Sequence, residues 1–293
     1  GRHFQKLFAD GHGPPMEVSM NELFKTQHFL LAFDLDGTLL NSEKTISPKT
    51  AGLLKELALQ GNRIVLASGR PLRSVRYYQE MLGLNGPIIA YNWAMIQCFE
   101  DPTFPTFMRT ISLSVFTDFY LLFENHIVNY MVENLTDQYY LEENKDYVNF
   151  FHPEGMKIHL GKEDFPTGKN LNAVVLRVDD LSVKQAMLDT IGKLDNDLAL
   201  RFWFNAPMFS EIYFRTTNKA TALEKVRNYY HIDREHMIAF GDAFNDLEMI
   251  RTAGISVAMK NGAPELKKAA TYISEDDNDH EGIYLTLKKL LQL

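Results

Sequence analysis

The chain has 293 residues, of which 45% are hydrophobic and 23% are charged, and its formal net charge is -8. This composition is typical of a folded protein, and no stretch approaches the ~18 consecutive apolar residues of a membrane span. The acidic balance argues against a nucleic-acid backbone as the main ligand, because that requires a basic surface. A small metabolite is the better-matched partner.

The single cysteine, Cys98, excludes an intramolecular disulfide and a cysteine-built metal site, and it is expected to be a small buried apolar group. The first residues lack the apolar centre and cleavage site of a secretory signal. We therefore expect a cytoplasmic protein with neither a membrane nor a nucleic-acid partner, whose oligomeric state the sequence does not indicate. Residues 1–27 are interpreted as an N-terminal extension, partly foreign to the native protein and without a chemical role.

The segment 28–96 alternates predicted strands and helices. An apolar run at 28–36 predicts a strand buried on both faces. A helix is predicted over 47–61, with Ser47 as its cap, Pro48 at its first position and Gly61 as its stop. Buried strands at 63–68 and 87–92 flank a second predicted helix, and this order is typical of a doubly wound parallel sheet.

The same alternation of predicted strands and helices returns after about residue 214. It is broken between these two parts of the chain. The segment 97–213 is richer in aromatic residues and in the period-two alternation of half-buried strands, with two predicted helices. The sequence therefore predicts an α/β core formed by residues 28–96 and 214–293, interrupted by an inserted α+β domain at 97–213.

Polar clusters follow the predicted strands or begin the predicted helices. They are "DLDGT" (34–38), "SGR" (68–70), "NK" (218–219) and "GDAFND" (241–246). Because the active crevice of an open parallel sheet lies beyond the carboxyl ends of its strands, these clusters are expected to meet there.

The aspartates among them predict a metal site. Asp34 and Asp36 would point to the same face of a strand and repel each other, unless the strand ends there or a cation lies between them. With Asp242 and Asp246 in the same crevice, a hard cation is required, and Mg²⁺ fits because it takes oxygen ligands and keeps waters that a phosphate can replace.

Ser68 and Lys219 complete a predicted phosphoryl-transfer site, as a hydroxyl donor and a fixed positive charge for phosphate oxygens. Asp34 is the candidate to attack phosphorus and form an acyl phosphate. Asp36 is the candidate to protonate the leaving oxygen and then deprotonate the attacking water. Taken singly, each cluster has an ordinary explanation, such as a helix cap or a solvated charge, and only their joint order favours a site.

These motifs, with "VAMKNG" following, resemble those of the haloacid dehalogenase superfamily, and the insertion resembles its branch with a large α/β cap, the Cof-like sugar-phosphate phosphatases. The resemblance implies a Rossmann-like core, a mobile cap and Mg²⁺-dependent hydrolysis of a small phosphorylated metabolite. It makes Asp34 the nucleophile and a metal ligand, and Asp36 the acid/base residue that lends its backbone carbonyl to the metal. The resemblance also implies roles for other residues. Phosphate would be bound by Ser68, Gly69, Lys219 and Asn245, the metal by Asp242 and Asp246, and the site would be ordered by Asn261.

The chain departs from the family pattern at Trp93, after Asn92, where the family commonly has glycine, and at Ala220 and Gly262. We expect catalysis to survive these changes and substrate fit to differ. Arg70 is open between contact with the substrate and pairing with a carboxylate. Other residues that could in principle bind a metal or a sugar ring are assigned to packing or the surface. They are His152, His159, His231, His236 and Trp203.

Two alternative functions remain open from the sequence. A phosphohexomutase of the same superfamily would keep Asp34 and Asp36 but return the phosphoryl group to a sugar. A phospho-aspartate signalling or binding protein also uses an aspartate, a hydroxyl and a lysine around Mg²⁺, although signalling receivers are compact single domains without so long an insertion.

Overall fold

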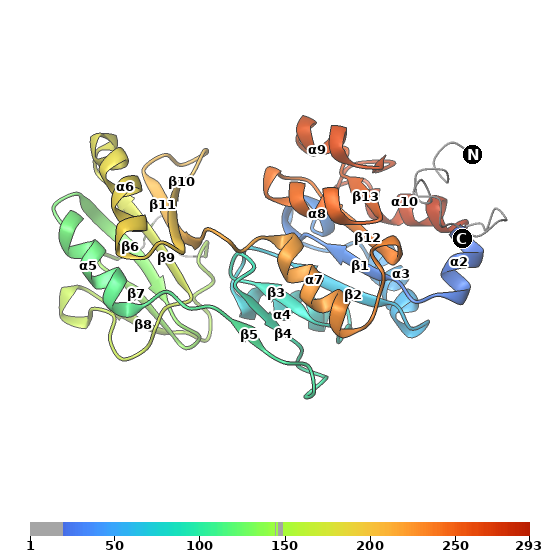
Figure 1. Cartoon of the computed structure of the whole chain (residues 1–293), viewed down its shortest axis with the longest axis horizontal. Helices are drawn as coiled ribbons and strands as arrows, with labels where there is room; N and C mark the ends of the chain where they lie inside the picture. Colours follow the sequence, from blue (N-terminus) through green and yellow to red (C-terminus); the bar gives the residue numbers. More distant parts are fainter. Residues whose placement is uncertain (1–19, 144, 146–148) are drawn as a thin grey trace. The chain divides into compact units, whose positions relative to one another are not determined.

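The computed structural model describes residues 20–143, 145 and 149–293 (Figure 1), so residues 1–19 of the expected N-terminal extension lie outside the described part. The chain divides into two compact units. The first combines the chain up to Thr106 with Asn218–Leu293, and the second is Phe107–Thr217. The second unit starts later than the predicted insertion because the chain first returns along the first sheet as an antiparallel strand after residue 94.

The first unit is built on a sheet in the order β14-β13-β12-β1-β2-β3-β4, to which the short strand β5 is added where the chain passes into the second unit. The pairs from β14 to β3 are parallel, and β3 and β4 are antiparallel. The strands are β1 (Leu30–Phe33), β2 (Arg63–Ala67), β3 (Ile88–Ala90), β4 (Met95–Gln97), β5 (Phe107–Met108), β12 (Met237–Gly241), β13 (Ile255–Ala258) and β14 (Tyr272–Ile273). Every residue of β1, β12 and β13 is buried, as expected for parallel strands covered on both faces.

Helices precede, connect or follow these strands along the chain. They are α2 (Met20–Thr26), α3 (Pro48–Leu59), α4 (Leu72–Met81), α7 (Lys219–Tyr229), α8 (Leu247–Thr252), α9 (Pro264–Ala269) and α10 (Gly282–Leu291). The predicted start of α3 is confirmed, since the Ser47 hydroxyl accepts a hydrogen bond from the Thr50 N–H and Pro48 is the first helical residue. At α7, the side chains of Asn218 and Thr221 cap each other's backbone N–H groups.

The second unit is a six-stranded sheet in the order β10-β11-β9-β6-β7-β8, in which only β7 and β8 are parallel among the paired strands of its described residues. The strands are β6 (Ile127–Glu133), β7 (Asp137–Tyr140), β8 (Lys157–Leu160), β9 (Ala173–Val178), β10 (Leu198–Phe202) and β11 (Phe209–Phe214). Two helices, α5 (Leu113–Phe123) and α6 (Lys184–Leu194), cover one face (Figure 1) and bury an apolar core with it.

These two sheets confirm the predicted fold class, a mostly parallel α/β core with a separate mixed sheet in the insertion. The strands β4, β5 and β8 were not among the predicted elements. Three of the four residues of β8 are exposed, so it carries little of the apolar alternation that marks a strand in a sequence. Within the described residues, no helix has the length and apolar character needed to cross a membrane.

Candidate active site

Asp34 follows β1 directly and continues its pairing with β12. Its N–H donates to the Phe240 carbonyl over 3.2 Å, and the chain then turns through residues 35–39, closed by a 3.2 Å bond from the Leu39 N–H to the Asp34 carbonyl. Gly37 has a φ of 75°, and a Cβ there would overlap the Asp242 carboxylate. The turn therefore requires glycine, and it brings its backbone against the loop after β12.

Asp34, Asp242 and Asp246 form one carboxylate cluster, with candidate ligand oxygens within 4.8 Å of one another. Burial raises the pKa of Asp34 well above its usual range, and the neighbouring Asp246 carboxylate raises it further. Burial likewise raises the pKa of Asp242, whose Oδ1 accepts a 2.9 Å hydrogen bond from the Thr38 hydroxyl. Three carboxylates confined in this way repel one another.

The donor chemistry of this cluster fits a divalent cation. Hard cations prefer carboxylate oxygens, and a bound cation would remove the mutual repulsion that raises the pKa values of Asp34 and Asp242. These three carboxylates are the residues that could hold such a cation.

Lys219, the first residue of α7, is fully buried beside the carboxylates. Its Nζ forms a close ion pair with Oδ1 of Asp246 and lies 3.3 Å from Oδ1 of Asp34. Burial alone would lower the pKa of Lys219, but the two carboxylates outweigh that effect and raise it. A positive charge at a helix N-terminus is unfavourable to the helix dipole, so the carboxylates are what keep this ammonium there.

Asp246 also organises the loop that carries Asp242. Its Oδ2 accepts hydrogen bonds from the N–H groups of Asp242 at 3.0 Å and Ala243 at 3.1 Å. Because its other oxygen pairs with Lys219, Asp246 links the lysine to the loop that carries Asp242. Sequence reasoning placed Asp246 near the metal but did not anticipate this pairing.

Asp36 points to different partners from Asp34. The guanidinium of Arg70 donates hydrogen bonds to both carboxylate oxygens of Asp36, each over 2.7 Å. Lys44 Nζ lies 2.9 Å from Oδ1 of Asp36. Burial raises the pKa of Asp36, but these hydrogen bonds and charges outweigh it and lower the pKa to about 2. The end of the strand therefore separates the carboxylates of Asp34 and Asp36. Of the two roles that the sequence left open for Arg70, the structure shows pairing with a carboxylate.

Ser68 and Gly69 follow β2 at the same end of the sheet. Ser68 is buried, and its hydroxyl accepts a 3.1 Å hydrogen bond from the Arg70 N–H. A Cβ on Gly69 would lie 2.6 Å from Oδ1 of Asn92, so the Asn92 side chain lies directly against the Gly69 backbone. The structure thus brings the predicted phosphate-binding loop and Asn92 together.

Asn261 and Gly262 tie the loop after β13 to the site. The Asn261 amide donates to the Gly37 carbonyl over 2.8 Å. A Cβ on Gly262 would lie 2.9 Å from the Asp242 carbonyl, so this glycine, one of the departures from the family pattern, allows close backbone packing. Asn245 is exposed, and Ala220 is buried.

Thr38 and Lys44 are site residues that the sequence analysis did not single out. Thr38 belongs to the quoted "DLDGT" motif, and its place in the same short turn as Asp34 was the available signal. Lys44 lies in the loop before α3, with a φ of 62°, and nothing in the local sequence marks it as a partner of Asp36.

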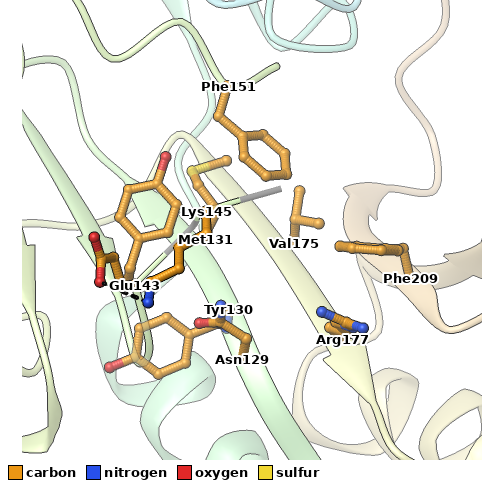
Figure 2. Close-up of a pocket in the computed structure, with 10 residues that line it drawn as sticks. Asn129, Tyr130, Met131, Glu143, Lys145, Phe151, Val175, Arg177 and Phe209 are labelled. Atoms are coloured by element: carbon orange, nitrogen blue, oxygen red, sulfur yellow. Dashed lines mark hydrogen bonds and ion pairs between the residues drawn. The ribbon is translucent and has the colours of Figure 1, made fainter. Parts of the chain in front are cut away.

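The second unit carries a hollow on its sheet (Figure 2), whose floor residues form a cluster separate from the core that α5 and α6 bury. Its apolar floor is formed by Met131, Tyr140, Phe151, Val175 and Phe209. Polar groups at its margin include Asn129, Glu143, Lys145 and Arg177, and the Arg177 guanidinium lies 5.7 Å from the centre of the Phe209 ring. Trp203 stacks on Phe209 at 5.4 Å, so it supports this wall by packing.

The histidines assigned to packing or the surface include one with two acidic partners. His159 stacks on Tyr139, and its ring nitrogens lie 2.7 Å from Asp137 and 2.7 Å from Asp164. This arrangement is an ion-pair network of the second unit.

The chain matches known proteins over nearly its whole length. The family model for haloacid dehalogenase-like hydrolases matches residues 31–287. The chain is 29% identical over 273 residues to the 5-amino-6-(5-phospho-D-ribitylamino)uracil phosphatase YitU of Bacillus subtilis, covering 92% of this chain and 100% of that one. It is 30% identical to YcsE of the same organism, described by the same activity, covering 87% of this chain and 92% of that one.

A solved structure agrees with these sequence matches. The crystal structure of a haloacid dehalogenase-like hydrolase from Bacteroides thetaiotaomicron superposes with a TM-score of 0.76 at 26% identity, covering 90% of this chain and 100% of that chain. The match spans both units, as the resemblance of the motifs implied. The chain therefore belongs to the haloacid dehalogenase-like hydrolase family, and within it to the Cof-like phosphatases.

Proposed function

We propose that the protein is a Mg²⁺-dependent phosphomonoesterase that hydrolyses a small phosphorylated metabolite through a phosphorylated Asp34. The observation that carries this proposal is the buried ammonium of Lys219 beside Asp34 and Asp246, at the edge of a three-carboxylate cluster. A fixed positive charge next to a carboxylate that is itself next to metal-binding oxygens suits attack on an anionic phosphoryl group.

In the first step, an oxygen of Asp34 forms a bond to phosphorus while the bond to the ester oxygen breaks. The electron pair goes to the leaving oxygen, which takes a proton from Asp36. In the second step, water attacks the acyl phosphate, Asp36 accepts its proton, and Asp34 is restored as inorganic phosphate leaves. Asp34, Asp242 and Asp246 would hold Mg²⁺, which would supply neutralisation of the phosphoryl charge.

The other residues of the site bind and orient the phosphate. Lys219 compensates the negative charge gathered around Asp34, and Ser68 with the Gly69 backbone offers donors at the neighbouring strand end. Arg70 holds Asp36 as a carboxylate, the form that the second step requires. A proton taken up by Asp36 must first weaken this pairing, so Arg70 controls when Asp36 can act as an acid.

For the substrate, we propose a metabolite with a hydroxylated organic part, such as a sugar or polyol phosphate. Two relatives carry the name of a phosphatase for a ribitylamino-uracil phosphate. The hollow of the second unit is suited to holding such an organic part, because aromatic walls receive flat or apolar surfaces while Asn129 and Arg177 offer polar contacts. The inserted unit is accordingly proposed to select the leaving group.

A screen of phosphorylated metabolites with Mg²⁺ tests the proposal by the release of inorganic phosphate. We expect sugar and polyol phosphates to be hydrolysed and the Asp34→Asn protein to be inactive on all of them. Arg177→Met should raise the KM of the preferred metabolite and leave hydrolysis of p-nitrophenyl phosphate unchanged. Conversion of glucose or mannose monophosphates into isomers without phosphate release would instead identify a mutase.

A further inference from the structure

Three successive residues in the hairpin turn between β3 and β4 have left-handed backbones. Tyr91, Asn92 and Trp93 have φ values of 51°, 52° and 70°. The Ala94 N–H donates to the Tyr91 carbonyl over 3.1 Å, and the Tyr91 N–H donates to the Arg70 carbonyl over 2.9 Å. The first hydrogen bond closes the turn, and the second ties its first residue to the loop that carries Arg70.

A tryptophan is an unfavourable residue for this backbone. Asparagine tolerates the left-handed region, but a bulky side chain with a Cβ is strained there, and glycine would remove the strain. Strained residues that persist despite a simple remedy occur at functional sites. A contribution of the Trp93 side chain that glycine cannot make would explain why this backbone persists.

The Trp93 side chain is buried against the ammonium of Lys219. The Lys219 Nζ lies 4.4 Å from the centre of the indole ring, within the range of an attractive cation–π contact. The other close partners of this Nζ are the carboxylates of Asp246 and Asp34. An ammonium has three donors, so the indole face occupies the direction that the carboxylates leave open.

We propose that Trp93 is a positioning residue for Lys219: its ring face holds the ammonium between Asp34 and Asp246 and keeps water from that side. The kinetic part of this inference rests on the proposed phosphatase function. A desolvated cation–π contact stabilises by ~2 kcal/mol, which corresponds to about 30-fold in an equilibrium constant. Loss of the ring should therefore lower kcat by about 10- to 30-fold, with little change in KM.

Two substitutions at Trp93 distinguish the electrostatic contribution of the aromatic ring from the space that the side chain fills. Trp93→Phe keeps an aromatic face and should retain most of the activity on p-nitrophenyl phosphate. Trp93→Leu keeps an apolar side chain on the same strained backbone and should lose kcat as above. Equal kcat values for the Phe and Leu proteins would overturn the proposal.

Fluorinated tryptophans test the electrostatic contact without changing the shape of the side chain. In the Trp203→Phe background, Trp93 is the sole tryptophan, so mono-, di- and trifluorotryptophan label that position alone. Each fluorine withdraws electrons from the ring face and weakens its attraction for a cation. We expect log kcat to fall steadily with the number of fluorines, and a flat series would contradict the proposed contact.

A double-mutant cycle on thermal unfolding tests the contact independently of any activity. Trp93→Leu should lower the Tm more in the protein with Lys219 than in the Lys219→Met protein, because the ammonium is absent from the latter. Equal shifts in both backgrounds would overturn the Trp93–Lys219 contact even in an active phosphatase. If the coupling is present and no phosphate is released from any substrate, the proposed function fails and the contact stands. Should Lys219→Met fail to fold, the Tm values of the fluorinated proteins test the contact instead: we expect the Tm to fall with each fluorine, and equal Tm values across the series would overturn the contact.

Discussion

Arg70 forms a two-pronged ion pair with Asp36, in which Nε lies 2.7 Å from Oδ2 and Nη2 lies 2.7 Å from Oδ1. Such bidentate pairing fixes the carboxylate in one orientation and favours its charged form. Since Asp36 is the proposed proton shuttle, Arg70 sets both its direction and its proton affinity.

We expect Arg70→Gln to raise the pKa of Asp36 above its value of about 2, because the largest of the influences that hold it down is removed. Carbon-13 NMR titration of aspartate carboxyl groups measures this, with Asp36→Asn identifying the resonance. Arg76→Gln is the matched control, because Arg76 lies nearby in α4 and pairs with Glu80 and Glu100 and not with Asp36. An unchanged Asp36 titration in Arg70→Gln would show that the ion pair does not govern this carboxyl.

Much of the site could be predicted because the parallel sheet brings the site residues to one edge. Asp34, Ser68 and Asp242 each follow a buried strand, and the carboxyl ends of parallel strands meet at one edge of the sheet. The start of α3 at Ser47 and Pro48 could be predicted because a helix cap depends only on residues within four positions along the chain.

The remaining contacts could not be predicted because they depend on long-range geometry. The turn of residues 35–39 decides that Asp36 faces Arg70 and Lys44, and nothing in the "DLDGT" string specifies that direction. The stacking of Trp93 on Lys219 joins residues more than a hundred positions apart and requires a left-handed backbone that a sequence does not show. Strand β4 is too short to carry a periodic signal.

Removal of divalent metal is expected to abolish phosphate release. Without a cation, the mutual repulsion of Asp34, Asp242 and Asp246 favours a protonated carboxyl, which is a poor nucleophile. Activity after EDTA treatment should return with Mg²⁺ and return poorly with Ca²⁺, which prefers more ligands at longer distances. Full turnover in excess EDTA would exclude a metal role for this cluster.

The second unit should become less stable as the pH rises above 6.5. Burial alone would lower the pKa of His159, but hydrogen bonds to Asp137 and Asp164 raise it above 6.5. Both ring nitrogens can donate only in the imidazolium form, so its stabilisation is fully present below pH 6.5 and is lost as the pH rises through the folded-state pKa.

Thermal unfolding between pH 5.5 and 9 measures this effect as the difference in Tm between the wild type and His159→Gln. We expect the difference to be largest at the acidic end and to shrink as the pH rises. Asp164→Asn, which removes one acidic partner, should give an intermediate dependence. A difference in Tm that is the same at every pH would contradict a charged His159 in the folded protein.

Acid-quenched intact mass measurement of the Asp36→Asn protein tests the assignment of nucleophile and proton shuttle most directly. Asp36→Asn leaves the Asp34 carboxylate but removes a shuttle that typically contributes about 10²- to 10⁴-fold. With p-nitrophenyl phosphate, whose leaving group needs little protonation, we predict a burst of about one nitrophenolate per enzyme and a phosphoryl group on Asp34. Asp34→Asn should show neither burst nor added mass. Turnover by Asp34→Asn, together with an Asp36→Asn protein that gains no phosphoryl mass, would contradict the assignment.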